Sequence, residues 1–164
     1  MAGIVDIVNR ALAKLGGARI AALGEKVPAA ALAASLFETV RDAEISAHGW
    51  HFAMTRKIIS AEVEKPAFGW ANQFLLPADC LRLLMAGPWP GPVMRDLIAD
   101  DSRLFVLEGG RILTNLGPTV PVRYLRRVED PALYPAVFVE ALACRLAAEM
   151  AESLTGSTSK KQMA

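Results

Sequence analysis

Apolar residues recur at helical spacing in the first third of the chain. The stripe between Ile4 and Leu15 predicts one helix, and the glycine pair that follows it suits a helix end. Pro28 is a good first-turn residue for a second helix, which we expect to run to about His48. The predicted apolar ridge of that helix is Leu32, Leu36 and Val40, with Ala29, Ala33 and Phe37 beside it. The charged residues assigned to solvent are Glu38, Arg41, Asp42 and Glu44.

The hydrophobic period changes from 3.6 to 2 at Trp50, which predicts short strands in the middle of the chain. Extended segments are expected over 50–55, 68–76 and 81–85. The Gly109-Gly110 pair predicts a hairpin between 103–107 and 111–114. A further strand is expected over 120–125, and Pro121 favours an edge position for it because proline cannot donate to a ladder.

A second helical region follows the strands. Asp130 and Pro131 form a cap and first-turn pair, and Pro135 is expected to restart the helix proper. Gly156 is its predicted end. The apolar stripe of this helix is Phe138, Val139, Leu142, Leu146 and Met150.

Helices at both ends and strands between them predict an α+β fold. We expect a helical bundle built from the N- and C-terminal segments, with a small antiparallel β-sheet or sandwich inserted between them. The prediction is a single domain over 1–164, with a helical part at 1–49 and 131–164 and a β part at 50–130.

The chain is unusually apolar, with 53% hydrophobic and 21% charged residues. Its longest apolar run, Val27–Ala34, is far shorter than the roughly 20 residues of a membrane span, so no membrane association is expected. Alanine accounts for part of the apolar excess. The remainder indicates a protein that assembles with other subunits.

No motif in the sequence indicates catalysis, and we expect neither an enzyme nor a bound cofactor. His48 and His51 are three residues apart, but Gly49 between them breaks the helical geometry that a metal site would need. Cys80 could in principle act as a nucleophile with one of these histidines, although a packed thiol is the better interpretation. Cys144 lies within a predicted helix and is assigned to packing.

The net charge of +1 gives no general attraction to nucleic acid. Basic residues nevertheless concentrate in two places, and we treat them as candidate contacts to a partner or to DNA phosphates. A solvated strand edge and a charged tail are the alternative interpretation, and a small nucleic-acid-binding or regulatory module is the alternative function. The candidate residues are Arg123, Arg126, Arg127, Lys160 and Lys161.

Four segments, taken in order, resemble one known family. They are the first helix ending in Leu15-Gly16, the segment His48–Phe52, the segment Phe74–Arg82 and the segment Val139–Ala147. In order and spacing they resemble the tail tubular protein A family, the head-to-tail adaptors, or connectors, of tailed bacteriophages and gene transfer agents. Members of this family commonly continue past the point that corresponds to Ala164.

The resemblance implies a structural virion protein. Such a subunit would form a homo-oligomeric ring, typically a dodecamer, beneath the portal protein and above the tail or stopper proteins. The ring would extend the channel through which DNA passes without specific binding. The implied location is the neck of a virion or phage-like particle that is made in the bacterial cytoplasm. The aromatic residues Trp50, Phe52, Trp70 and Phe74 would be core or subunit-contact residues.

Overall fold

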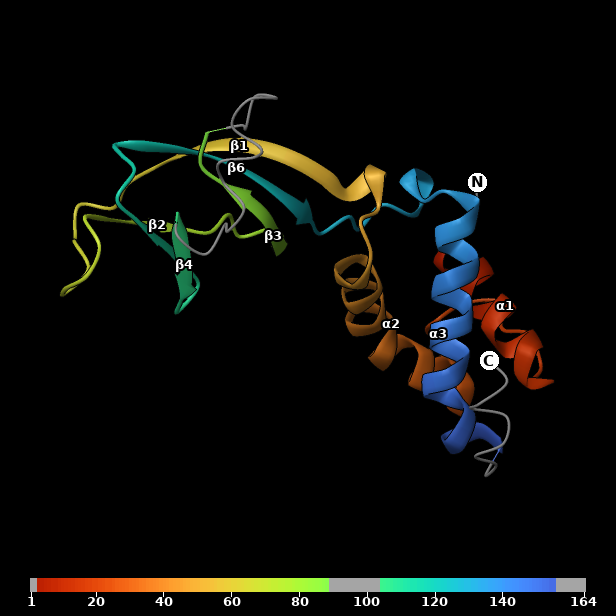
Figure 1. Ribbon diagram of the computed structural model, residues 1–164. Helices are drawn as coiled ribbons and strands as arrows, with labels where there is room; N and C mark the ends of the chain where they lie inside the picture. The colour runs from red at the N-terminus through yellow and green to blue at the C-terminus, as the bar shows by residue number, and fades with distance from the viewer. Residues whose placement is uncertain (1–2, 89–103, 156–164) are drawn as a thin grey trace. The chain divides into compact units, whose positions relative to one another are not determined.

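The structure is a computed structural model that describes residues 3–88 and 104–155. The chain divides into two compact units (Figure 1). The helical unit comprises residues 1–52 and 128–164, and the sheet unit comprises residues 53–127. Helices from both ends of the chain and antiparallel strands between them confirm the predicted α+β class.

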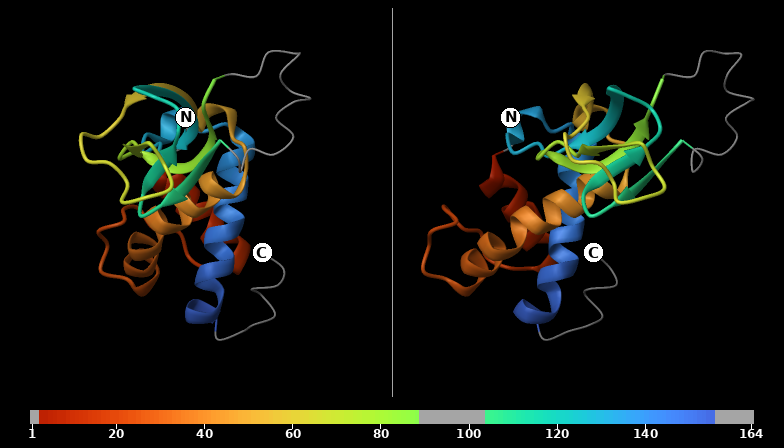
Figure 2. Two further views of the ribbon diagram at one scale, coloured as in Figure 1. Left: turned by 60° about the vertical axis from the view of Figure 1, so that its left-hand side comes forward. Right: turned by 90° about the vertical axis from the view of Figure 1, so that its left-hand side faces the viewer.

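Helix α3 (Ala136–Thr155) is the centre of the helical unit because it packs on both α1 (Ile4–Leu15) and α2 (Pro28–Ala47) (Figure 1, Figure 2). Its sequence explains this position. The buried side chains form two adjacent rows at four-residue spacing, so the apolar surface is wide enough for two neighbours. One row is Phe138, Leu142, Leu146 and Met150, and the other is Val139, Ala143, Ala147 and Ala151.

The ends of α1 and α2 follow the predicted local chemistry. Gly16 ends α1 with a φ of 73°, a left-handed conformation that glycine adopts without steric cost. Pro28 is the first residue of α2. The loop between the two helices is held to α1 by Asn9, whose buried side-chain amide exchanges two hydrogen bonds of 2.8 and 2.9 Å with the backbone of Ile20.

The prediction for the faces of α2 was wrong for Arg41 and Glu44. Both were assigned to solvent, and both are only 5% exposed. Each is compensated by a charged neighbour: Arg41 Nε lies 2.8 Å from Asp42 Oδ1, and Glu44 Oε2 lies 3.4 Å from Arg145 Nη1. The buried apolar residues of α2 include Val40 of the predicted ridge and its predicted neighbours Ala33 and Phe37, together with Ala30 and Ile45.

The strand predicted to start at Trp50 begins later. Residues His51–Ala53 form a short 3₁₀ turn, and β1 is Met54–Ser60. The alternating aromatic residues Trp50 and Phe52, which predicted a strand, instead pack in the aromatic cluster of the helical unit. Phe138 meets Trp50, Phe52 and Tyr134 with ring centroids 5.1, 4.8 and 4.9 Å apart, and the indole N–H of Trp50 donates to the Glu44 carbonyl at 3.0 Å.

The chain re-enters the helical unit through a capped turn, as predicted. The Asp130 carboxylate accepts a hydrogen bond of 2.9 Å from Ala132 N–H and caps the short turn Pro131–Leu133. Helix α3 follows directly after Pro135. The predicted helix end at Gly156 lies outside the described residues.

The sheet unit contains two three-stranded antiparallel sheets. The first has the order β1-β6-β3 and the second the order β2-β5-β4. A shared core lies between them, made mainly by Phe74, Ile112, Val120, Val122 and Tyr124. The remaining strands are β2 (Asn72–Leu75), β3 (Cys80–Ala86), β4 (Phe105–Glu108), β5 (Arg111–Thr114) and β6 (Thr119–Arg126).

The predicted hairpin is confirmed, and the predicted edge strand is not. Gly109 and Gly110 both have positive φ, 55° and 76°, between the paired strands β4 and β5. However, β6 is the central strand of its sheet. The Pro121 carbonyl accepts a hydrogen bond of 3.0 Å from Gly87 N–H, so this carbonyl and the Pro121 nitrogen both face the β3 side of the strand. Because β3 ends at Ala86, the N–H that proline lacks costs the sheet no ladder hydrogen bond there.

Truncating Phe138 should destabilise the helical unit. Its ring is fully buried and contacts three other aromatic rings, so we expect Phe138→Ala to lower the free energy of unfolding by about 3–5 kcal/mol. Denaturant titration at low protein concentration measures this change. Val137→Ala is the matched control, since the neighbouring side chain is 71% exposed and should change stability little. Equal losses in the two variants would contradict the packing described for α3.

Candidate interaction surface

The outer face of the first sheet is the most distinctive surface of the sheet unit. Side chains alternate across a strand, so the buried residues Val120, Val122 and Tyr124 place their neighbours in β6 on the opposite face. The register assigns the facing residues of β1 and β3 to that same outer face. We call this surface the arginine face, and it is formed by Arg56, Ile58, Arg82, Met85, Pro121 and Arg123.

The arginine face is apolar in its middle and hollowed. A hollow of about 570 Å³ is lined in part by Ile58, Met85 and Pro121, and Ile58 is 75% exposed. A second hollow of about 380 Å³ adjoins it and is lined by Arg56 and Arg123 with Met54 and Thr55. Large exposed apolar side chains beside cationic groups are typical of a protein-binding surface.

Two arginines face one another directly on this surface. The register pairs Arg56 of β1 with Arg123 of β6, and like charges at opposing positions of a sheet disfavour the pairing. Arg123 is half-buried and its guanidinium lies 3.0 Å from the sulfur of Met54, whereas Arg56 and Arg82 are exposed. The register therefore places three arginine side chains on one face of the sheet.

The structure brings together only part of the predicted basic cluster. Arg123 lies on the arginine face. Arg126 is paired with Cys80 on the opposite side of the sheet, and Arg127 follows β6 with its N–H donating to the Asp79 carbonyl at 2.7 Å. Lys160 and Lys161 lie outside the described residues.

Sequence reasoning missed Arg56 and Arg82 as members of the surface. The alternation Met54, Arg56, Ile58 could have placed Arg56 on one face of its strand. Nothing in the sequence, however, shows that β6 pairs with both β1 and β3, and that pairing is what brings the three arginines together.

The residues considered for chemistry belong to different units. His48 and His51 belong to the helical unit, whereas Cys80 belongs to the sheet unit. Burial raises the pKa of the Cys80 thiol, and the Asp79 carboxylate adds to this, which reduces the thiolate available at neutral pH. In the part of the chain that the structure describes, no group of three or more His, Cys, Asp or Glu side chains is placed to hold a metal ion.

The helical unit carries an acidic, apolar surface where α3 begins. Glu129 and Asp130 are exposed, and Leu133 and Val137 follow them with 50% and 71% of their surface open to solvent. We call these four residues the acidic edge. Val27, at 40%, is the one other large apolar side chain exposed in the described part of this unit.

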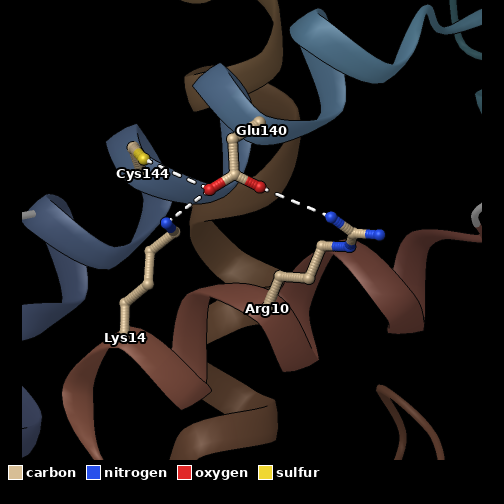
Figure 3. A network of polar contacts seen from close by, with 4 residues as sticks. All are labelled: Arg10, Lys14, Glu140 and Cys144. Atoms are coloured by element: carbon tan, nitrogen blue, oxygen red, sulfur yellow. Dashed lines mark hydrogen bonds and ion pairs between the residues drawn. The ribbon is translucent and has the colours of Figure 1, made fainter.

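Glu140, one turn further along α3, is neutralised within the unit (Figure 3). Its carboxylate contacts Lys14 Nζ and lies 3.4 Å from Arg10 Nη1, so α1 and α3 are linked across their outer surface. The hydrogen bond from Lys14 is the main cause that lowers the pKa of Glu140.

Both tyrosines of the chain are held in the neutral form by burial. Burial raises the pKa of Tyr134 to about 12, and its hydroxyl donates to the Val128 carbonyl at 2.7 Å. Burial also raises the pKa of Tyr124, whose hydroxyl lies 2.9 Å from Asp79 Oδ1. Burial alone would raise the pKa of Asp79, but the hydrogen bond from Tyr124 and the charge of Lys57 bring it below its usual value.

Comparison with known proteins gives no match to a protein-family model and no significant match to a curated protein. Among the helices described here, none is long and apolar enough to cross a bilayer.

Tyrosine ionisation should report the burial of these two side chains. Because their pKa values are raised, the folded protein should show little tyrosinate at pH 10, where exposed tyrosine is half ionised. The stability contributed by neutral Tyr134 is fully present below pH 10 and is lost as the pH rises toward 12. Ultraviolet absorbance, read alongside circular dichroism, measures both effects. Half-maximal tyrosinate at pH 10 in the folded state would contradict the described burial.

Proposed function

We propose that this chain is a structural subunit of a phage-like particle, a head-to-tail adaptor that forms a ring between the portal and the tail. In this role each copy contacts its neighbours in the ring, the portal above and the tail or stopper proteins below. The ring continues the channel through which DNA leaves the head. No catalytic step is part of this function.

The main support is the exposed apolar surface on both units. In the helical unit Leu133 and Val137 are half exposed or more, and in the sheet unit Ile58, Phe68 and Val63 are 75%, 88% and 101% exposed. Such side chains on separate units give each subunit at least two different surfaces for contacts. Two different surfaces are what a head-to-tail ring requires.

The resemblance to the tail tubular protein A family rests on segments that the structure places in both units. The His48–Phe52 segment closes the aromatic cluster of the helical unit, and the Phe74–Arg82 segment spans β2 and the start of β3. The Val139–Ala147 segment lies within α3 and includes five of its buried residues, Val139, Leu142, Ala143, Leu146 and Ala147. These segments thus contribute residues to the cores of the two units.

A nucleic-acid-binding or regulatory module is the second candidate function, and the arginine face favours it. Three arginines on one face of a sheet could contact consecutive phosphates. This function predicts tight binding to short duplex DNA that weakens steeply as the salt concentration rises. The adaptor predicts only weak, non-specific binding, because its net charge is +1 and the face is apolar in its middle.

The adaptor function is tested in particles from the producing cell. Deleting the gene should leave DNA-filled heads without attached tails, and a copy of the wild-type gene should restore tailed particles. Cryo-electron microscopy of the restored particles should show the chain as a ring at the neck. Normal tailed particles without the chain, or a single copy elsewhere in the particle, would contradict the proposal.

A further inference from the structure

We infer that the loop between β1 and β2 of one copy of the chain binds the loop between α1 and α2 of a second copy. We call residues 61–71 the apolar loop and residues 16–27 the basic loop. This inference rests on the proposed function, since it names a contact that would repeat around the ring. The two loops belong to different units, so the contact is heterologous and can propagate from copy to copy.

The apolar loop presents large apolar side chains to solvent. Val63 is 101% exposed and Phe68 is 88% exposed, the two highest values among the large apolar residues that the structure describes. Phe68 also lines a hollow of about 400 Å³ together with Trp70 and Leu113. An exposed aromatic side chain beside an apolar hollow is typical of a protein-binding surface.

Hydrogen bonds hold both ends of the apolar loop. Glu62 N–H donates to the Gln73 carbonyl at 2.8 Å, so the start of the loop is tied to β2. Ala71 N–H donates at 3.0 Å to the side-chain oxygen of Asn115, the residue after β5. Because the loop is already held in position, little conformational entropy is lost when a partner binds it.

The surface around the apolar loop carries a negative excess. Arg111 Nε lies 2.7 Å from Glu62 Oε2, and the register places Glu108 opposite Arg111. The pKa of Arg111 is raised mainly by its hydrogen bond to Glu62 and to a lesser extent by the charge of Glu64. With Lys65 counted, three carboxylates share two cations, and Glu64 and Glu108 are both exposed.

The basic loop has the opposite balance of charge. Arg19 and Lys26 are exposed, and in the described part of the chain neither forms an ion pair. The Glu25 carboxylate accepts from two backbone N–H groups of the loop, and Asn9 holds the loop to α1. Val27, next to Lys26, is 40% exposed. This loop therefore offers two cations and an apolar side chain.

Charge favours the basic loop over the other apolar surface of the helical unit. The acidic edge also exposes apolar side chains, but its two carboxylates would meet Glu64 and Glu108 as like charges. Duplex nucleic acid is disfavoured for the same reason, because its phosphates repel carboxylates. The basic loop instead places opposite charges around Val27, which gives the apolar centre and charged rim of a usual protein interface.

Charge reversal on each loop tests the contact. The first variant is Glu64→Lys with Glu108→Gln, because a cation at position 108 would face Arg111 in the register. The second is Arg19→Glu with Lys26→Glu. Each variant alone should associate about tenfold more weakly than the wild type in sedimentation at low salt, since like charges then meet at the contact.

An equimolar mixture of the two variants should recover association. The altered apolar loop of one then meets the reversed basic loop of the other, and their unchanged loops meet as in the wild type. Glu129→Lys is the control for charge reversal at an exposed site outside both loops and should leave association unchanged.

Removing the exposed ring tests the apolar part of the contact. Phe68→Ser should weaken association about 30-fold, because the largest side chain of the apolar contact is lost. Leu133→Ser is the matched control, since Leu133 is 50% exposed but lies on the acidic edge, and it should leave association unchanged. Circular dichroism and melting temperature confirm that each variant folds.

Three results would overturn the inference. They are undiminished association of either charge variant, a mixture that associates no better than its parts, and a wild-type chain that stays monomeric up to about 1 mM at low salt. Weaker association of Leu133→Ser with Phe68→Ser unchanged would assign the contact to the acidic edge instead. A ring at the particle neck that survives these variants would leave the adaptor function standing without this contact. Recovery in the mixture without a neck location would support the contact and contradict the adaptor function.

Discussion

The two-sided burial of α3 is the constraint on which the rest of the structure depends. A helix with two adjacent apolar rows cannot be covered by one neighbour, so both N-terminal helices are required to bury it. These helices come from the opposite end of the chain. The chain must therefore leave the helical unit at Phe52, form the sheet unit as one excursion and return at Val128. Aromatic packing of Phe138 on Trp50 and Phe52 secures the exit, and Tyr134 secures the return.

Buried charge makes this arrangement specific. Glu44 is almost fully buried in α2, and Arg145 of α3 lies near enough to compensate it, with His48 Nε2 also 3.8 Å away. A buried carboxylate tolerates few other neighbours, because losing its cation leaves an unpaired charge in the interior. The pair therefore favours the alignment in which Arg145 lies beside Glu44. The Lys14–Glu140 contact does the same for α1 and α3 at lower cost, since it remains exposed (Figure 3).

Structural features that depend on the local sequence were predicted correctly. Features that depend on pairing between distant segments were not. Gly16, Pro28 and Gly109-Gly110 act through the backbone of their own neighbourhood, so their roles followed from the sequence. The burial of Arg41 and Glu44 depends on which helices surround them, and helical spacing alone could not show this. Pro121 lies in a central strand because β3 ends beside it, a coincidence of register that no local pattern reveals. The arginine face was only partly found for the same reason: Arg56, Arg82 and Arg123 come from three strands joined by long connections.

The two crossings between the units have a mechanical consequence. Strand β1 begins just after the first crossing and β6 ends just before the second, and the two are paired from Met54 with Leu125 onward. A pull between the units thus loads two covalent connections at once. Because both strands are pulled from the same end of the β1–β6 ladder, their hydrogen bonds are not sheared past one another. A subunit built this way can transmit strain between its units without first losing a strand.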